Sequence, residues 1–371
     1  MSDRPDVAIA GAGLMGSLLG WRLARQGYRV ELYEAGSEEA PAAAAYTAAA
    51  MVAPWSELPV CDPALFDWGR QSLQLWPQLL DELHADTGER IPMGRKGSVI
   101  VAHPADQAEL QDFGRYMQRH GQSPRTGVHR LDRAAIEALE PALSGRFRDG
   151  FWMEHEAHIE NRPMLALLRR AILERGGRIH YQRSVCFEAD AVTVDGQPTA
   201  AGLWIDSCGT GASPWLPDLR GVRGEVIWIE AADVHISRPV RLLHPRYHLY
   251  LVPKTHGRYI LGATEIESED RSPVSVRSAL EMLSALYALC PALAEARVLE
   301  MSSNLRPALF GHLPRIGRYG QRIQVNGLFR HGYLLAPAML VRLQQECGLA
   351  LQVPTTFAPV IGAADMTAGA L

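Results

Sequence analysis

Hydrophobic and polar residues change their spacing along the chain, and these changes mark the expected elements. The sequence begins with an apolar strand, DVAIAG, followed by a glycine-rich turn, a helix over 14–26 and a second strand over 29–35. This order is typical of the start of a βαβ unit. Apolar residues then recur every three to four positions, which predicts further helices over 65–85, 106–120, 132–140 and 161–177.

The middle of the chain has a different character. A strand is expected at 97–103, and the segment 178–213 combines several short strands with glycine and Asp-Gly turns. More strands and one more helix follow, the strands over 224–231, 248–254 and 258–265 and the helix over 274–293.

This mixture of elements argues against one simple doubly wound sheet. It predicts an α/β nucleotide-binding domain of the Rossmann-like type that is assembled from separated segments of the chain. A second domain with a mixed β-sheet is inserted between these segments, so the chain as a whole is of the α+β class. A length of 371 residues also exceeds what one hydrophobic core usually serves, so two domains are expected. We place the discontinuous nucleotide-binding domain at 1–88, 150–222 and 300–371, and the inserted domain at 89–149 and 223–299.

Composition and charge exclude several classes of protein. The formal net charge is -4, so no basic face for nucleic acid is expected. No apolar run approaches the ~18 residues of a membrane span, and the N-terminus does not read as a signal peptide. The five cysteines are scattered and form no CxxC pair, which argues against a zinc site or a disulfide framework and favours a reducing cytoplasm. No self-association stripe is evident, so we expect a monomer.

The first turn carries a dinucleotide-binding pattern. Gly11, Gly13 and Gly16 have GxGxxG spacing between the first strand and the first helix. Gly11 permits the tight turn, Gly13 lets the backbone approach a pyrophosphate, and Gly16 lets helix and strand pack closely. Glu34 ends the second strand, where a carboxylate suits the two ribose hydroxyls of an adenosine and disfavours a 2′-phosphate. These residues leave NAD and FAD both open.

A series of motifs along nearly the whole chain narrows this choice. They are GAGLMGSLLG with Glu34, TAAAMVAP (47–54), SVCFEA around Val185, WIDSCGTGAS (204–213), GVRGEV (221–226), YHLYLVPKTHGRYILGATE (247–265), NLRPALFGHLPRIGR (304–318) and NGLFRHGYLLAPAM (326–339). In their order and spacing, they make the chain similar to the flavin-dependent amine and amino-acid oxidoreductases of the D-amino-acid-oxidase type. Within these it resembles most the glycine oxidases associated with thiamine biosynthesis.

The resemblance implies FAD and a cofactor domain of the glutathione-reductase type. Covalent attachment in this family uses a histidine in the N-terminal loop or a cysteine near the returning strand. The segment 47–51 contains no histidine and 312–317 contains no cysteine, so non-covalent FAD is expected. The implied cofactor contacts are Gly11, Gly13, Met15, Gly16, Glu34, Ala35, Thr47, Ala49, Ala50, Met51, Val185, Cys208, Gly209, Gly211, Arg306, Arg330, His331, Gly332, Tyr333 and Leu334. Ala50 stands where relatives usually have glycine, so the backbone is expected to sit a little differently there.

The resemblance also implies a substrate site. Arg306 matches the arginine that binds the substrate carboxylate, which a planar, permanently charged fork suits. Tyr250 matches a tyrosine over the same carboxylate, and Arg330 an arginine near the pocket and flavin. His248 would share a strand face with Tyr250. Glu265 departs from the apolar residue of glycine oxidases: it either recognises a further cationic group or excludes plain amino acids, or it points to solvent.

The expected reaction is oxidation of an amine or amino acid, such as glycine, sarcosine or a D-amino acid, by hydride transfer to flavin N5. Molecular oxygen is the expected acceptor. Two alternatives stay open: a dehydrogenase on the same fold that uses a quinone or a protein acceptor, and an FAD-binding protein with little catalysis. No metal is expected.

The segment 326–339 reads as a loop followed by the start of a helix, with Pro337 in the first turn, where a missing N–H costs nothing. The resemblance places the backbone of Gly332, Tyr333 and Leu334 against the pyrimidine edge of the flavin. This helix end would be a second cofactor-holding terminus, beside the one at Gly11.

Overall fold

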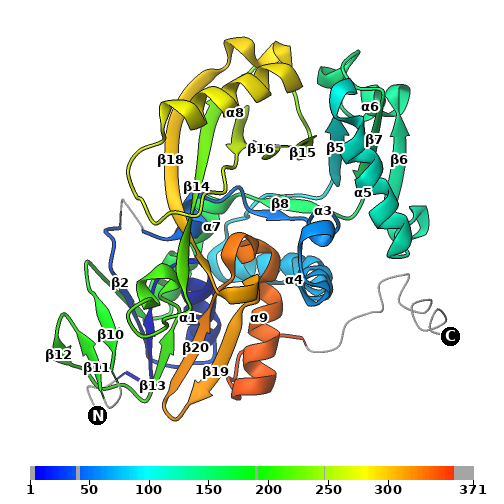
Figure 1. Ribbon diagram of the computed structural model, residues 1–371. Coiled ribbons are helices and arrows are strands. Elements are labelled where there is room, and N and C mark those ends of the chain that lie inside the picture. The colour runs from blue at the N-terminus through cyan, green and yellow to red at the C-terminus, as the bar shows by residue number, and fades with distance from the viewer. Residues whose placement is uncertain (1–4, 39–41, 189–190, 246, 355–371) are drawn as a thin grey trace.

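Two sheets organise the chain, one in the lower half and one in the upper half of Figure 1. The computed structural model describes residues 5–38, 42–188, 191–245 and 247–354, and only the backbone at Tyr247 and His248. In the lower sheet, neighbouring strands are parallel except for the pair at one edge. The strands, in spatial order, are β19 (Arg315–Tyr319), β20 (Arg322–Asn326), β13 (Leu203–Asp206), β1 (Val7–Ala10), β2 (Val30–Glu34) and β9 (Arg178–Tyr181).

Four helices pack with this sheet around one apolar core. α1 follows β1 and leads to β2, which confirms the βαβ start. Because α1 packs against neighbours on several sides, nearly its whole length is buried, including Gly20, where a Cβ would lie 2.9 Å from Leu32. The helices are α1 (Leu14–Arg25), α4 (Pro63–Thr87), α7 (Asn161–Glu174) and α9 (Gly332–Cys347).

The upper sheet has eight strands and is mixed. β15 pairs in parallel with β5, and all other neighbouring strands of this sheet are antiparallel. In spatial order the strands are β18 (Arg297–Ala308), β14 (Arg220–Glu230), β17 (Arg258–Gly262), β16 (Tyr247–Lys254), β15 (Val240–His244), β5 (Ser98–Ala102), β7 (Asp149–Met153) and β6 (Val128–Asp132). Helix α8 (Val276–Leu289) lies over one face of this sheet (Figure 1), and its inward side chains join the core there.

Shorter elements complete the fold. Two three-stranded sheets consist of β10 (Val185–Phe187), β11 (Val192–Val194) and β12 (Gln197–Pro198), and of β3 (Met51–Val52), β8 (Ala157–Ile159) and β4 (Met93–Gly94). The remaining α-helices are α2 (Ala44–Thr47), α3 (Pro54–Glu57), α5 (Gln107–Arg119) and α6 (Arg133–Leu139). None of the helices in the described ranges combines the length and hydropathy needed to cross a bilayer.

The predicted fold class is confirmed: a largely parallel sheet with flanking helices stands beside a mixed sheet. The strands of the mixed sheet come from 98–153 and 220–308. The exact bounds of the two domains stay a prediction.

The position predicted for Pro337 is wrong. α9 begins at Gly332, so Pro337 is its sixth residue and lies in the second turn. A residue there would normally donate its N–H to the carbonyl of Tyr333. The indole N–H of Trp76 in α4 donates to that carbonyl instead, at 2.8 Å. The next residue, Ala338, donates its N–H to Ser72 Oγ at 3.2 Å. Contacts from α4 therefore satisfy the backbone that Pro337 disturbs.

Replacing Trp76 by phenylalanine should lower the free energy of unfolding by about 1–2 kcal/mol, because the buried carbonyl of Tyr333 loses its donor. Urea denaturation followed by circular dichroism measures this. Trp68→Phe, on the same helix, is the control, since its ring still stacks under Arg342, whose guanidinium is 4.4 Å away. Equal losses in the two variants would contradict the role assigned to the indole N–H.

Candidate functional site

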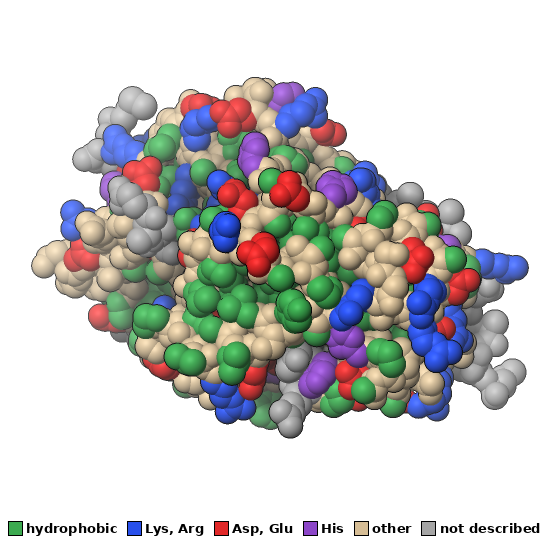
Figure 2. Space-filling view, turned by 90° about the horizontal axis from the view of Figure 1, so that it is seen from above, with side chains coloured by type: hydrophobic (Ala, Val, Ile, Leu, Met, Phe, Trp, Pro, Cys, Tyr) green, Lys and Arg blue, Asp and Glu red, His purple; other side chains and the backbone are tan. Residues whose placement is uncertain are grey.

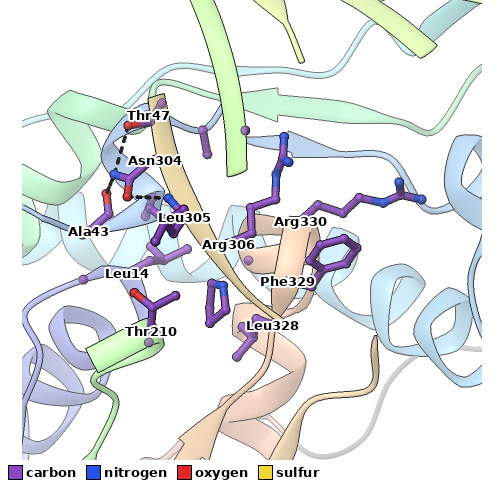
Figure 3. Close-up of a pocket in the computed structure, with 18 of the residues that line it drawn as sticks. Leu14, Ala43, Thr47, Thr210, Asn304, Leu305, Arg306, Leu328, Phe329 and Arg330 are labelled. Atoms are coloured by element: carbon purple, nitrogen blue, oxygen red, sulfur yellow. Dashed lines mark hydrogen bonds between the residues drawn. The ribbon is translucent and has the colours of Figure 1, made fainter. Parts of the chain in front are cut away.

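A cavity of about 1340 Å³ is lined by residues of both large sheets and of the loops between them. Figure 3 shows part of its lining: β18 crosses the site, and Arg306 and Arg330 reach into the region from β18 and from the turn before α9. Asn304, also on β18, donates to the carbonyl of Ala43 and to Thr47 Oγ1, each at 3.2 Å. These bonds fix the segment around α2 to the strand beside the cavity.

The GxGxxG turn lies at one end of the cavity, and Gly11 and Gly16 each have a steric reason. Gly11 has a φ of 90°, and a Cβ there would lie 2.5 Å from the carbonyl oxygen of Ser207. A Cβ on Gly16 would lie 1.9 Å from the carbonyl oxygen of Gly11. Gly13 lines the cavity and directly precedes α1, whose first turn has no side-chain cap. Its uncapped N–H groups and the space beside Gly13 fit a pyrophosphate.

Glu34 lies at the same end, at the end of β2. One carboxylate oxygen accepts the N–H of Ala12 at 2.9 Å, and the other accepts the N–H of Gly36 at 2.9 Å. The carboxylate is buried but lines the cavity, and each oxygen keeps a further lone pair for a ribose hydroxyl. The chemistry of this end of the cavity therefore fits the adenosine half of FAD.

The loop of residues 47–51 runs along the cavity, and its backbone has the conformation that glycine would favour. Ala50 has a φ of 57°, a left-handed conformation that costs an alanine about 1–2 kcal/mol. Ala50 therefore carries local strain, and the expected difference in backbone position from relatives stays a prediction. The loop is tied down by Lys254, whose buried Nζ donates to the carbonyls of Ala49 at 2.9 Å and Ile159 at 2.6 Å. Burial lowers the pKa of Lys254 to about 8, although Glu160 acts in the opposite sense.

The N-terminus of α9 supplies the second helix end. Gly332, Tyr333 and Leu334 line the cavity, and the first turn of α9 has no side-chain cap. Uncapped N–H groups from α1 and from α9 therefore both belong to turns that border this cavity.

Arg306 and Tyr250 lie together on the side of the cavity formed by the mixed sheet. The guanidinium of Arg306 donates to the carbonyl of Thr264 at 2.9 Å and to that of Arg223 at 3.3 Å. No carboxylate in the described part of the chain forms a salt bridge with it. A Cβ on Gly224 would lie 2.3 Å from its Cζ, so only glycine leaves room for this side chain. Burial raises the pKa of Tyr250, with the charge of Arg306 opposing this.

A charged cluster borders Arg306. Glu57, at the end of α3, contacts Arg330 at 2.9 Å, His331 Nε2 at 3.1 Å and also Arg241. Burial alone would raise the pKa of Glu57, but Arg330, Arg241 and His331 together hold it well below its usual range. Arg330 also pairs with Glu265 at 2.8 Å. Glu265 lines the cavity, but it is bound to an arginine and does not simply point to solvent.

Glu57 and Arg241 were not anticipated from the sequence. Glu57 lies in an apolar stretch, WSELPV, and Arg241 interrupts the apolar start of a strand, PVRLLH. A charged residue inside an otherwise apolar run is the one signal that could have found them.

The predicted cofactor contacts all line the cavity except Gly16, which packs against the turn. Tyr250, Arg306, Arg330 and Glu265 line it as well. The side chain of His248 lies outside the described residues. Burial raises the pKa of Cys208 well above its usual value, so this lining cysteine is a thiol. Within the described ranges, no group of three or more His, Cys, Asp and Glu side chains could hold a metal ion.

Comparisons with known proteins agree with this geometry. Residues 6–341 match the family described as DAO, FAD dependent oxidoreductase. A Rhizobium etli protein, named as a thiamine biosynthesis oxidoreductase ThiO, is 39% identical over 90% of this chain and 93% of its own length. A glycine oxidase from Geobacillus kaustophilus is 26% identical over 91% of each chain.

The fold is shared as well. The crystal structure of glycine oxidase from Geobacillus kaustophilus superposes with a TM-score of 0.80, at 24% identity, covering 96% of this chain and 100% of the other. The match over most of the chain, together with a cavity that fits a dinucleotide, shows that this protein belongs to the DAO family of FAD-dependent oxidoreductases.

Proposed function

We propose that the chain oxidises a small amine that carries one carboxylate, of the glycine, sarcosine or D-amino-acid type. The observation that carries this proposal is the guanidinium of Arg306, which borders the cavity and has carbonyl acceptors only. A carboxylate offers a planar guanidinium two charge-assisted hydrogen bonds. Relatives of this chain that are named glycine oxidase support the choice of substrate class.

The charges around Arg306 favour a single carboxylate. Arg306, Arg330 and Arg241 are three positive charges, while Glu57 and Glu265 are two negative charges, which leaves one positive charge over. A substrate with one carboxylate balances the site, whereas a second carboxylate would leave an excess of negative charge. Because Glu265 is paired with Arg330, we propose that it positions this arginine and does not bind a cationic group of the substrate.

FAD, when bound, supplies the two-electron acceptor for the hydrogen removed from the substrate carbon next to the amine. The chain binds and orients: Arg306 holds the carboxylate, and Tyr250 narrows the site beside it. The uncapped N–H groups at the start of α9 provide a positive potential at the border of the cavity. This potential would stabilise negative charge on the pyrimidine edge of the flavin when FAD is bound. No side chain is proposed as a catalytic base, since the substrate reacts with its amine neutral.

We propose further that FAD is held non-covalently and that molecular oxygen reoxidises it. Relatives named as oxidases support the acceptor. Peroxide formed in stoichiometric amounts under air would support an oxidase, and a requirement for a quinone or protein acceptor would support the dehydrogenase alternative. A cytoplasmic location is also proposed, and the five free cysteines are in keeping with it.

Replacing Arg306 by lysine should raise the dissociation constant for a carboxylate-bearing substrate about 30- to 150-fold. The reason is that lysine cannot form the two parallel hydrogen bonds of the guanidinium. Anaerobic titration of the flavin absorbance with glycine, sarcosine, N-alkyl glycines and D-amino acids measures this. Arg306→Ala should prevent reduction at the same concentrations while FAD stays bound.

Amines of the same size without a carboxylate serve as the matched ligands, and their weak binding should be the same in the lysine variant and the parent. If these amines reduce the flavin as readily as the amino acids do, the substrate carboxylate is not recognised and the role proposed for Arg306 is contradicted. If no amine reduces it, the chain is an FAD-binding protein with little catalysis.

Glu57→Gln should lower the free energy of unfolding at pH 7 by about 3 kcal/mol, because Arg330 and Arg241 lose the buried charge between them. The folded-state pKa of Glu57 is depressed, so this contribution is full above the ordinary carboxyl pKa of 4.5 and is lost as pH falls toward the folded value. Urea denaturation between pH 7 and pH 3 measures the difference. The control, Glu265→Gln, removes a half-exposed charge and should cost less than about 1 kcal/mol.

A difference between parent and Glu57→Gln that stays the same down to pH 3 would show that the charge of Glu57 contributes nothing.

A further inference from the structure

Lys254, at the end of β16, is a buried cation. It is 8% exposed, although lysine is almost never buried unless it is paired. Figure 2, by contrast, shows Lys and Arg side chains at the surface of the face that it views. The one other lysine of the sequence, Lys96, is exposed. The position of Lys254 therefore calls for an explanation from its surroundings.

The ammonium of Lys254 is bound by carbonyl groups. It donates to the carbonyl of Ala49 at 2.9 Å and to that of Ile159 at 2.6 Å. Among the described residues, no carboxylate forms a contact ion pair with it. Because no contact ion pair cancels this charge, its field reaches the loop that it binds.

Two titratable groups face the ammonium, one on β8 and one directly after it. Glu160 acts on Lys254 as a negative charge, but its carboxylate accepts the N–H of Thr255 at 2.8 Å and so is held by the backbone beyond β16. His158 is buried, and burial together with the charge of Lys254 lowers its pKa to about 3. His158 is therefore neutral at pH 7, and Lys254 is the positive group of this cluster.

The loop of residues 47–51 separates the ammonium from the cavity. Ala49 and Ala50 line the cavity, whereas Lys254 and Ile159 do not. The carbonyl of Ala49 points at the ammonium, so the N–H of Ala50, on the other side of the same trans peptide, points away from it. No described residue accepts this N–H. A buried N–H needs an acceptor, and a molecule bound in the cavity is placed to supply it.

The part of FAD that lies beside this loop follows from the two ends of the cavity. Glu34 lies at the end that fits the adenosine half. Ala49 instead packs against Val226 of the mixed sheet, in a cluster that Tyr250 borders. FAD that extends from the adenosine end therefore has its isoalloxazine ring beside the loop of residues 47–51.

We propose that Lys254 is a positioning residue for the flavin, and that its charge, acting through the peptide between Ala49 and Ala50, raises the reduction potential of bound FAD. The ammonium fixes this peptide with its N–H toward the cavity and adds a positive charge behind it. A flavin that has taken up two electrons and one proton carries one negative charge, whereas the oxidised ring is neutral. Positive potential therefore stabilises the reduced ring more than the oxidised ring.

The conformation of Ala50 supports this role. Its φ of 57° is left-handed, which alanine disfavours. Hydrogen bonds hold the backbone on both sides of it: Lys254 binds the carbonyl of Ala49, and the N–H of Ile159 donates to the carbonyl of Ala50 at 3.0 Å. The peptide is thus held in an orientation that the chain would not choose locally, as is typical of a group that must face a ligand.

The expected size of the effect follows from the separation of the groups. One peptide unit and two hydrogen bonds place the ammonium roughly 8 Å from an acceptor of the Ala50 N–H. A unit charge at about 8 Å, with an effective dielectric constant of about 20, changes an equilibrium about 30-fold, and the charge of Glu160 reduces this. We therefore expect the affinity for reduced FAD, relative to oxidised FAD, to depend on the ammonium by about 10- to 30-fold.

Lys254→Met, which removes the charge and keeps the length of the side chain, tests this in the FAD-loaded protein. It should lower the reduction potential of the bound flavin by about 30–45 mV at pH 7, because a two-electron couple shifts by about 30 mV for each tenfold change. Anaerobic reduction beside a reference dye, followed by flavin absorbance, measures the potential. Lys96→Met is the matched control and should leave it unchanged. The proposal needs FAD in the cavity and does not depend on which amine is oxidised.

The pH dependence separates a role of the charge from a purely structural role. Burial lowers the pKa of Lys254 to about 8, with Glu160 opposing this, so the ammonium is mostly charged at pH 7 and loses its charge at higher pH. The parent and Lys254→Met should therefore differ in potential at pH 7, and the difference should shrink toward about pH 10. A side chain that only ties the loop in place would give the same difference at both pH values.

Because the sequence holds two lysines, the charge can also be observed directly by NMR. With carbon-13 at the ε-carbon of lysine, the FAD-loaded protein gives two signals, and Lys96→Met removes one of them. The signal of Lys254 should titrate near pH 8. Reduction of the flavin should raise the pKa of Lys254 by about 1 to 1.5, because the coupling between the two charges is reciprocal.

An equal potential in the parent and in Lys254→Met at pH 7 overturns the proposal. So does a difference that stays constant up to about pH 10, or an equal loss in Lys96→Met. If Lys254→Met does not retain FAD, the NMR signal of the parent decides. A pKa that is the same with oxidised and with reduced flavin overturns the proposal, and a pKa that rises on reduction supports it.

Discussion

The guanidinium of Arg306 is held by the carbonyls of Thr264 and Arg223, and the described chain gives it no carboxylate. Burying a cation is costly unless it is paired, so its surroundings must be fixed in advance. Glu225 accepts a hydrogen bond from Thr264 Oγ1 at 3.0 Å and pairs with Arg223 at 2.7 Å. The same ion pair thus anchors both carbonyls, and Gly224, which stands between Arg223 and Glu225 in the sequence, leaves the space in which Arg306 lies.

Distant parts of the chain are brought together around this charge. The turns before α1 and α9, more than 300 positions apart, both border the cavity. Lys254 and Asn304, on two strands of the mixed sheet, bind the carbonyls of loops that belong to the other half of the molecule. The mixed sheet therefore contributes residues that hold segments of the other half in place.

The sequence predicted the features that depend on neighbours along the chain. The glycine turn, Glu34 and the first helix follow from local spacing and steric needs. The family motifs pointed to Arg306 and Arg330, which line the cavity, while their roles stay a prediction. Glu57 and Arg241 were missed because their pairing exists only after α3 and β15 meet, and no local pattern signals it.

The prediction that Pro337 lies in the first turn of its helix was wrong for a similar reason. The compensating donor, Trp76, is 257 positions from Tyr333, whose carbonyl it binds, so its contribution is invisible in the local sequence. Ala50 shows the opposite case: its left-handed backbone persists although the residue disfavours it, because the hydrogen bonds of Lys254 and Ile159 determine the loop. His331 found a partner in Glu57 that no motif indicated.

The bond from Trp76 to the carbonyl of Tyr333 also bears on the order of events during folding. Closing a loop of 257 residues is entropically expensive, and contacts of such long range are slow to form. α9 can hold its proline only once α4 is in place, so its N-terminal end depends on a contact that is distant in the sequence. The end of α9 that borders the cavity therefore depends on α4, a helix whose residues do not themselves line the cavity.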